Sequence, residues 1–116
     1  MALLLTPSGT GSAAHRLLKP KTILVVVTVR WKPSTTTQQK HRILDGVATM
    51  GQEIHGIQRV WIDSPKVQPP GFETAFALEF TDRAALNAFA TDPVHKRWDE
   101  IFVPQFETVY AQEITN

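Results

Sequence analysis

The sequence predicts a single α+β domain with strands and helices in the order β-α-β-β-α-β. The chain has 116 residues, which suits one domain and suffices to bury a core. Segments with strand-like composition or alternation are separated by two regions that carry apolar residues at helical spacing. No internal repeat competes with this order, so the elements can be assigned one after another along the chain.

The first half of the chain predicts a strand, a helix and a second strand. Residues 23–31, ILVVVTVRW, are apolar on both faces for most of their length, as in a central strand that is covered on both sides. Ser34 or Thr35 is expected to cap a helix over residues 36–54, whose apolar residues form one stripe. Residues 57–63, IQRVWID, alternate imperfectly and predict the next strand.

The second half predicts a strand, a helical region in two pieces and a last strand. Residues 72–80, FETAFALEF, alternate clearly, with large apolar side chains on one face and alanines and glutamates on the other. An aspartate precedes each helical piece and can cap it. The first piece covers residues 83–90, and the second begins at Pro93 and is stopped by Pro104. Residues 106–114 alternate again and complete the sheet.

This order predicts a ferredoxin-like arrangement, in which a four-stranded antiparallel sheet carries its helices on one face. The other face is expected to be too apolar for solvent. It would present Trp61, Ala75 and Ala77, and on the last strand Val109 and Ala111. A second copy of the sheet is the economical cover, so we expect a homodimer through the sheet faces.

Composition narrows the classes of function. The net charge of +1 gives no drive toward nucleic acid, and the seven Lys/Arg of residues 1–44 are too dispersed for a binding arm. The chain has no cysteine, which fits a reducing compartment, so a cytoplasmic location is expected. The apolar run near the start is too short for a membrane span. Residues 1–20 predict a flexible tail before a domain at 21–116.

His95 is the sharpest candidate for chemistry. It lies near the start of the helix that begins at Pro93, beside the apolar face of that helix. Imidazole can take and return a proton near neutral pH. Asp99, one turn further on, could hold the ring or could face solvent. The alternative is a histidine that only packs or caps at the rim of the sheet.

Other candidates are weaker. Tyr110 could reach across from the last strand and supply a phenol, or could be an ordinary strand aromatic at the edge. Thr74 could donate a hydrogen bond into the space between helices and sheet. No histidine pair has metal-ligand spacing, and no phosphate-binding loop or Ser/Cys nucleophile motif is present. We therefore expect no metal and no cofactor.

The sequence resembles the stress-responsive A/B barrel domain family, the dimeric α+β barrels, over about residues 22–114. The likeness rests on VRWKP, IHGIQRVWID and GFETAFALEFTD, and most specifically on FATDPVHKRWDEIFVPQFE. It implies a dimeric α+β barrel. It also implies an activity similar to that of the olivetolic acid cyclase-type polyketide cyclases, which fold a linear polyketide by aldol condensation.

The resemblance also implies roles for single residues. His95 falls on the catalytic acid/base of these cyclases, and Asp92 replaces a neighbouring histidine. Phe89 stands where the cyclases carry the tyrosine that pairs with the catalytic histidine, while Val25 and Thr74 stand where further histidines occur. Aliphatic residues replace pocket-lining aromatics on the first helix, so we expect an apolar and roomier pocket. Its expected lining is Val25, Ile43, Leu44, Val47, Thr74, Phe76, Phe89, Trp98 and Phe102.

The sequence therefore predicts a cofactor-independent cyclase or lyase that acts on a polyketide-like hydrophobic small molecule. His95 would be the acid/base, with Asp99 and Tyr110 as candidate partners. Two alternatives stay open. One is a non-catalytic small-molecule-binding or stress-response dimer of the same fold, and the other is a cofactor-free monooxygenase of the related barrel class.

Overall fold

The computed structural model describes residues 19–116, so the predicted tail at residues 1–20 lies outside it except for its last two residues. The predicted order of elements and the predicted fold class are confirmed. The elements are β1 (Ile23–Trp31), α2 (Thr37–Glu53), β2 (Ile57–Trp61), β3 (Thr74–Phe80), α3 (Arg83–Phe89), α4 (Pro93–Phe102), the 3-10 turn η1 (Val103–Gln105) and β4 (Phe106–Ile114).

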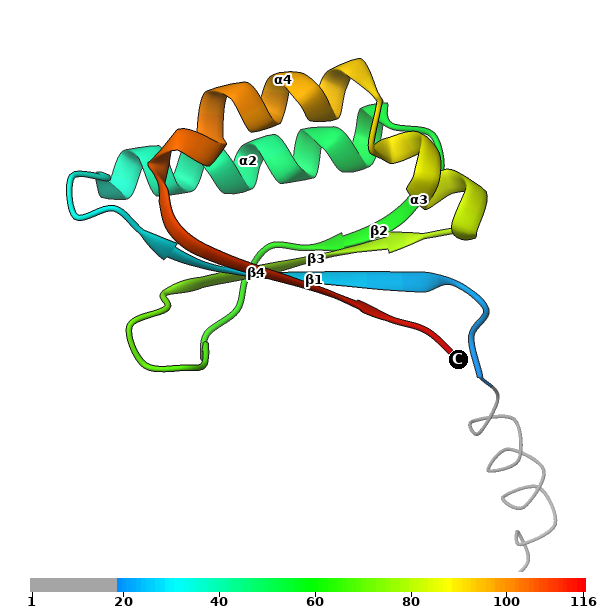
Figure 1. Cartoon of the computed structure of the whole chain (residues 1–116), viewed down its shortest axis with the longest axis horizontal. Coiled ribbons are helices and arrows are strands. Elements are labelled where there is room, and N and C mark those ends of the chain that lie inside the picture. The colour runs from blue at the N-terminus through cyan, green and yellow to red at the C-terminus, as the bar shows by residue number, and fades with distance from the viewer. Residues whose placement is uncertain (1–18) are drawn as a thin grey trace, which may run out of the picture.

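The strands form one antiparallel sheet in the order β2-β3-β1-β4. β1 pairs with both β3 and β4, which is the central position that its apolar sequence predicted. The helices lie together over one face of the sheet, with α2 and α4 side by side and α3 at one end (Figure 1). This is the ferredoxin-like arrangement, and it leaves the opposite face of the sheet, here called the open face, without helices.

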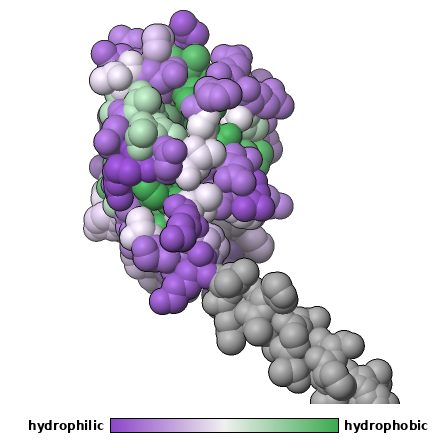
Figure 2. All heavy atoms as spheres, turned by 90° about the vertical axis from the view of Figure 1, so that its right-hand side faces the viewer, coloured by the Kyte–Doolittle hydropathy of each residue, from purple (hydrophilic) through white to green (hydrophobic). Residues whose placement is uncertain are grey.

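The core fills the space between the sheet and the helices. Alternate residues of β1 and β3 point into it, and α2 contributes its apolar stripe. The outer surface at the end that carries α3 is mostly hydrophilic, with hydrophobic side chains showing in patches (Figure 2). The buried core residues are Ile23, Val29, Trp31, Ile43, Val47, Met50, Ile54, Ile57, Phe76, Leu78, Phe80 and Trp98.

The helix α2 begins one or two residues later than its predicted caps. Its N-cap is Thr36, not Ser34 or Thr35. The Thr36 hydroxyl accepts a hydrogen bond from the Gln39 backbone N–H at 3.1 Å, and the Gln39 side-chain oxygen accepts one from the Thr36 N–H at 2.7 Å. This reciprocal capping box needs a glutamine or glutamate three residues after the cap. Thr35 with Gln38 and Thr36 with Gln39 both have that spacing, and the structure uses the second pair.

The loop between β2 and β3 is longer than predicted, because β2 ends at Trp61 and β3 begins at Thr74. The loop passes below the sheet on the open face (Figure 1). Phe72 therefore leaves the alternation of the strand, and its ring stacks on Tyr110 at 5.3 Å between centroids. The prediction that Phe72 shares a face with Phe76 was wrong, since a loop residue does not follow the two-residue period of a strand.

The faces of β4 also differ from the prediction. Ala111 pairs with Val27, and both line a cavity on the helix side of the sheet together with Val109. The prediction that Val109 and Ala111 lie on the open face was wrong. The pairing of β4 shifts by one residue near the end of β1, which breaks the strict alternation that starts at Phe106. Tyr110 consequently points to the open face.

Candidate functional site

A cavity of about 220 Å³ lies between the sheet and the helices. The three strands β1, β3 and β4 contribute to it from one side, and α2, α3, α4 and η1 contribute from the other. The polar side chains in its lining are those of His95 and Asp99. The lining residues are Val25, Val27, Met50, Phe76, Leu78, Phe89, His95, Trp98, Asp99, Val103, Phe106, Val109 and Ala111.

The structure brings only part of the predicted pocket together. Val25, Phe76, Phe89 and Trp98 line the cavity, but the remaining predicted pocket residues do not. At about 220 Å³ the cavity is small, since ligand pockets usually span roughly 300–1,000 Å³. The residues predicted to line the pocket that lie elsewhere are Ile43, Leu44, Val47, Thr74 and Phe102.

The predicted pocket residues that do not line the cavity contact other parts of the structure. Ile43 and Val47 are fully buried in the core, so their modest size makes no extra room in the cavity, contrary to the prediction. The Thr74 hydroxyl accepts a hydrogen bond from the Trp31 indole N–H at 2.8 Å. Phe102 packs edge-on against Trp98 on the outer side of that ring.

His95 is held at three points. Its Nδ1 lies 2.9 Å from the backbone carbonyl oxygen of Phe89, and its Nε2 lies 3.3 Å from Oδ1 of Asp99. The imidazole also stacks on the Phe89 ring, with 3.8 Å between centroids and 14° between planes. A carbonyl oxygen can only accept, so Nδ1 carries a proton and Nε2 is the nitrogen that can exchange one.

The local sequence explains this placement. Asp92 caps α4 by accepting a hydrogen bond from the Val94 N–H, and Pro93 opens the first turn. His95 and Asp99 are then one helical turn apart on the same side of α4. Phe89 ends α3 immediately before this turn. A short break between two helices therefore places a carbonyl, an aromatic ring and a carboxylate around one imidazole.

Trp98 lies between the cavity and α2. Its indole N–H donates to the Ile43 carbonyl at 3.3 Å. A Cβ added at Gly46 would lie 2.8 Å from the Trp98 ring, so the helix can approach this closely only because Gly46 has no side chain. A glycine inside a helix lowers the intrinsic stability of that helix, but Gly46 is required here for packing against Trp98.

Tyr110 is not brought near His95. It points to the open face, where it is 60% exposed and stacks on Phe72. Sequence reasoning missed much of the cavity lining. Met50 and Leu78 carried the signal of core residues only, and Val109 and Ala111 were hidden by the register shift in β4.

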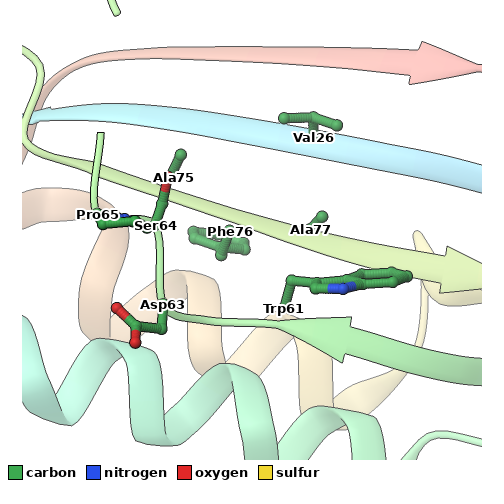
Figure 3. A pocket seen from close by; sticks show the side chains of 8 residues that line it. All are labelled: Val26, Trp61, Asp63, Ser64, Pro65, Ala75, Phe76 and Ala77. Atoms are coloured by element: carbon green, nitrogen blue, oxygen red, sulfur yellow. The ribbon is translucent and has the colours of Figure 1, made fainter. Parts of the chain in front are cut away.

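A second hollow, of about 260 Å³, lies on the open face between β2, β3 and the loop that follows β2 (Figure 3). The indole of Trp61 lies across one side of it, 49% exposed, with the small side chains of Ala75 and Ala77 nearby. Its lining residues are Val26, Trp61, Asp63, Ser64, Pro65, Ala75, Phe76 and Ala77.

The open face also carries a buried carboxylate. Glu79 is only 8% exposed in its side chain, and Arg59 Nε lies 2.5 Å from its Oε1. The Thr22 hydroxyl donates to Oε2 at 2.5 Å. These hydrogen bonds, from Arg59 first and from Thr22 second, lower the pKa of Glu79 below its ordinary value.

Within residues 19–116, no three His, Cys, Asp or Glu side chains come close enough together to hold a metal ion. In the same part of the chain, no helix has the length and apolar character that crossing a bilayer requires.

The fold and the cavity define a ferredoxin-like α+β domain with an apolar chamber beneath its helices and one imidazole in the chamber wall. The chain belongs to the Stress Responsive A/B Barrel Domain (Dabb) family, whose sequence profile matches residues 23–116. This confirms the family that the sequence resembled. Comparison with curated protein sequences gives no match.

Solved structures share the fold at low sequence identity. Hydroxynitrile lyase from Passiflora edulis aligns with a TM-score of 0.76 and 16% identity, over 84% of this chain and 94% of that one. A dimeric ferredoxin-like protein of unknown function from Bacteroides fragilis aligns with a TM-score of 0.68 and 13% identity, over 85% of this chain and 100% of that one. SnoaB, a cofactor-independent oxygenase from Streptomyces nogalater, aligns with a TM-score of 0.66 and 10% identity, over 83% of this chain and 93% of that one. Structures of this fold thus include enzymes and proteins of unknown function.

Proposed function

We propose that the protein is a cofactor-independent enzyme of the lyase or cyclase type that acts on a hydrophobic, polyketide-like small molecule. His95 would be the acid/base, and the cavity between the helices and the sheet would hold the reacting part of the substrate. The observation that carries this proposal is the His95 imidazole, oriented at Nδ1 by the Phe89 carbonyl, in the wall of an otherwise apolar cavity.

The geometry suits proton transfer. With Nδ1 fixed as a donor, Nε2 can remove a proton from a substrate carbon beside a carbonyl, or from a hydroxyl, and return it later. Apolar walls hold a chain in the folded conformation that reaction within one molecule requires, and such proximity can supply much of the rate. The side chains of the wall would select a substrate by shape, and His95 would act on its one polar group.

The small volume limits what the cavity can hold. About 220 Å³ accommodates a compact molecule, or one end of a longer chain whose remainder stays outside. Val103 and Val109 both line the cavity and are more than two-fifths exposed, so they mark the side on which such a chain would leave it.

We also propose that a second copy of the chain covers the open face, giving the dimeric α+β barrel. Trp61, Tyr110 and Ile114 are large apolar side chains that each expose about half of their surface or more. Trp61 and Tyr110 share the open face with the hollow of about 260 Å³. Large apolar side chains exposed on one face in this way are typical of a protein interface. The dimeric description of the similar protein from Bacteroides fragilis supports the same arrangement.

A non-catalytic ligand binder is the second candidate. It is favoured by the chemistry of the cavity wall, which offers no hydroxyl beside His95, because Phe89 fills that place. A binder would need only the apolar walls and one polar contact.

The experiment compares His95→Ala with His55→Ala, which removes an exposed histidine far along the chain from α4. Purified proteins are incubated with β-keto and β-hydroxy carbonyl compounds, while product formation, ligand-induced change in Tm and oxygen uptake are recorded. We expect His95→Ala to lose about 100-fold or more of kcat and to keep the ligand-induced rise in Tm. His55→Ala should behave as the wild type.

Three other results of this experiment would each lead to a different conclusion about the function. Unchanged turnover in His95→Ala refutes the proposal. A wild-type protein that is stabilised by these ligands but converts none of them is a binder. Turnover that consumes oxygen belongs to a monooxygenase.

A further inference from the structure

Both ring nitrogens of His95 face hydrogen-bond acceptors. The Phe89 carbonyl lies 2.9 Å from Nδ1, and the Asp99 carboxylate lies 3.3 Å from Nε2. A neutral imidazole has one N–H and can satisfy one of these acceptors, whereas an imidazolium has two and satisfies both. The Phe89 ring, stacked at 3.8 Å, adds the face of an aromatic ring, which attracts cations. The surroundings therefore offer an acceptor to each N–H of an imidazolium that forms when the ring takes a proton from a substrate.

We propose that Asp99 is the positioning residue that makes His95 an effective base, and that its charge restricts the site to neutral substrates. Asp99 would stabilise the imidazolium that forms when Nε2 takes a proton from the substrate. This inference rests on the proposed function of His95 and adds a specific partner and a substrate class to it.

The step is a simple proton transfer. An O–H or C–H bond of the substrate breaks, its proton goes to Nε2, and the electron pair remains on the substrate oxygen or carbon. The new N–H can donate to Asp99 while the Nδ1–H donates to the Phe89 carbonyl. The same proton returns to the product in a later step, so no further reactant is needed.

Nε2 stays available to a ligand. Its distance to Asp99 exceeds the roughly 2.7–2.9 Å of a full charge-assisted hydrogen bond. The Asp99 side chain is 44% exposed, so it can turn toward solvent, while the His95 side chain is 20% exposed and fixed by Phe89. A substrate atom can therefore share Nε2 with Asp99, which also lines the cavity.

Apart from His95, no other side chain in the described lining of the cavity can carry a charge beside Asp99. The elements β1, β3, β4, α2 and η1 present only apolar side chains to it, and the described lining contains no Lys or Arg. The nearby Asp92 carboxylate is engaged with the Val94 N–H at the start of α4. A site whose charged side chain is a carboxylate disfavours an anionic ligand, because no Lys or Arg in its described lining offsets the repulsion.

The test uses Asp99→Asn, which removes the charge at nearly constant shape, and Asp99→Glu, which restores it. Glu100→Gln is the matched control, because it removes the same charge from the next, exposed residue of α4. NMR signals of the His95 ring report, without any substrate, whether the ring keeps the same surroundings in each protein. Turnover of a neutral β-hydroxy ketone and of a matched carboxylate-bearing analogue is measured in parallel.

We expect Asp99→Asn to lower kcat with little change in KM. Asp99→Glu should recover part of the lost kcat, and Glu100→Gln should leave kcat and KM unchanged. The anionic analogue should be a poor substrate of the wild type and a better one of Asp99→Asn. A kcat that is the same in Asp99→Asn and Glu100→Gln overturns the inference, even if His95→Ala is inactive. A wild type that converts neither compound overturns the proposed function, and the inference with it.

Discussion

Replacing Gly46 by alanine tests how closely the helical layer is packed over the cavity. In an exposed helix this change is stabilising, by about 0.5–1 kcal/mol, because alanine restricts the unfolded chain and favours the helix. Here the added methyl group would lie 2.8 Å from the Trp98 ring and 3.1 Å from the Phe102 ring. Cβ atoms do not come this close to ring atoms, so Trp98 or the helix α2 must move.

The magnitude follows from these opposing effects. Overpacking a well-packed core costs about 1–3 kcal/mol, and the gain in helix propensity recovers less than about 1 kcal/mol of it. We expect Gly46→Ala to lower the free energy of unfolding by about 1–2 kcal/mol. The neighbouring change Asp45→Ala, at an exposed position of the same helix, should be neutral or slightly stabilising.

The assay is equilibrium unfolding in urea, with the transition followed by circular dichroism. A double-mutant cycle with Trp98→Phe isolates the cause, because the smaller ring should reduce the cost of Gly46→Ala. A Gly46→Ala protein that is more stable than the wild type by the ordinary helix gain would refute the reasoning. An unchanged cost in the Trp98→Phe background would show that the clash lies elsewhere.

Two further predictions concern the open face. Because Arg59 and Thr22 lower the pKa of Glu79, the carboxylate stabilises the fold above its unfolded pKa of about 4.3, and this is lost as the pH falls through the folded value. Glu79→Gln should therefore flatten the fall of Tm below about pH 4.3; an equally steep fall contradicts this. Trp61→Asp should convert the expected dimer to a monomer in light scattering, whereas Ile101→Asp, at an exposed site on α4, should not. Identical masses for the two variants would argue against an interface at Trp61.

Much of the fold could be predicted because the residues that indicate each helix or strand lie within that element or directly beside it. The bounds of β1, α4 and β4 were predicted with little error from β-branched runs, alternation, an aspartate cap and two prolines. The cap of α2 was misplaced by one or two residues, because Thr35 with Gln38 has the same capping-box spacing as Thr36 with Gln39. The error at Phe72 had a different origin, because a clear alternation does not reveal where pairing with a neighbouring strand begins.

The site was predictable only in part. His95 and Asp99 stand out by residue type and by their spacing of one helical turn. The third contact of His95, the Phe89 carbonyl, belongs to the backbone, and its position depends on the angle between α3 and α4. Tyr110 was misplaced for a similar reason, because a one-residue shift in the pairing of β4 sends its side chain through to the opposite face of the sheet.

The most direct test of the central claim is to map where a small neutral ketone binds, using NMR chemical-shift changes across residues 19–116. The account predicts that the changes centre on His95, Met50 and Ala111, which meet at the cavity beneath the helices. Changes confined to the open face around Trp61, with His95 unaffected, would contradict it.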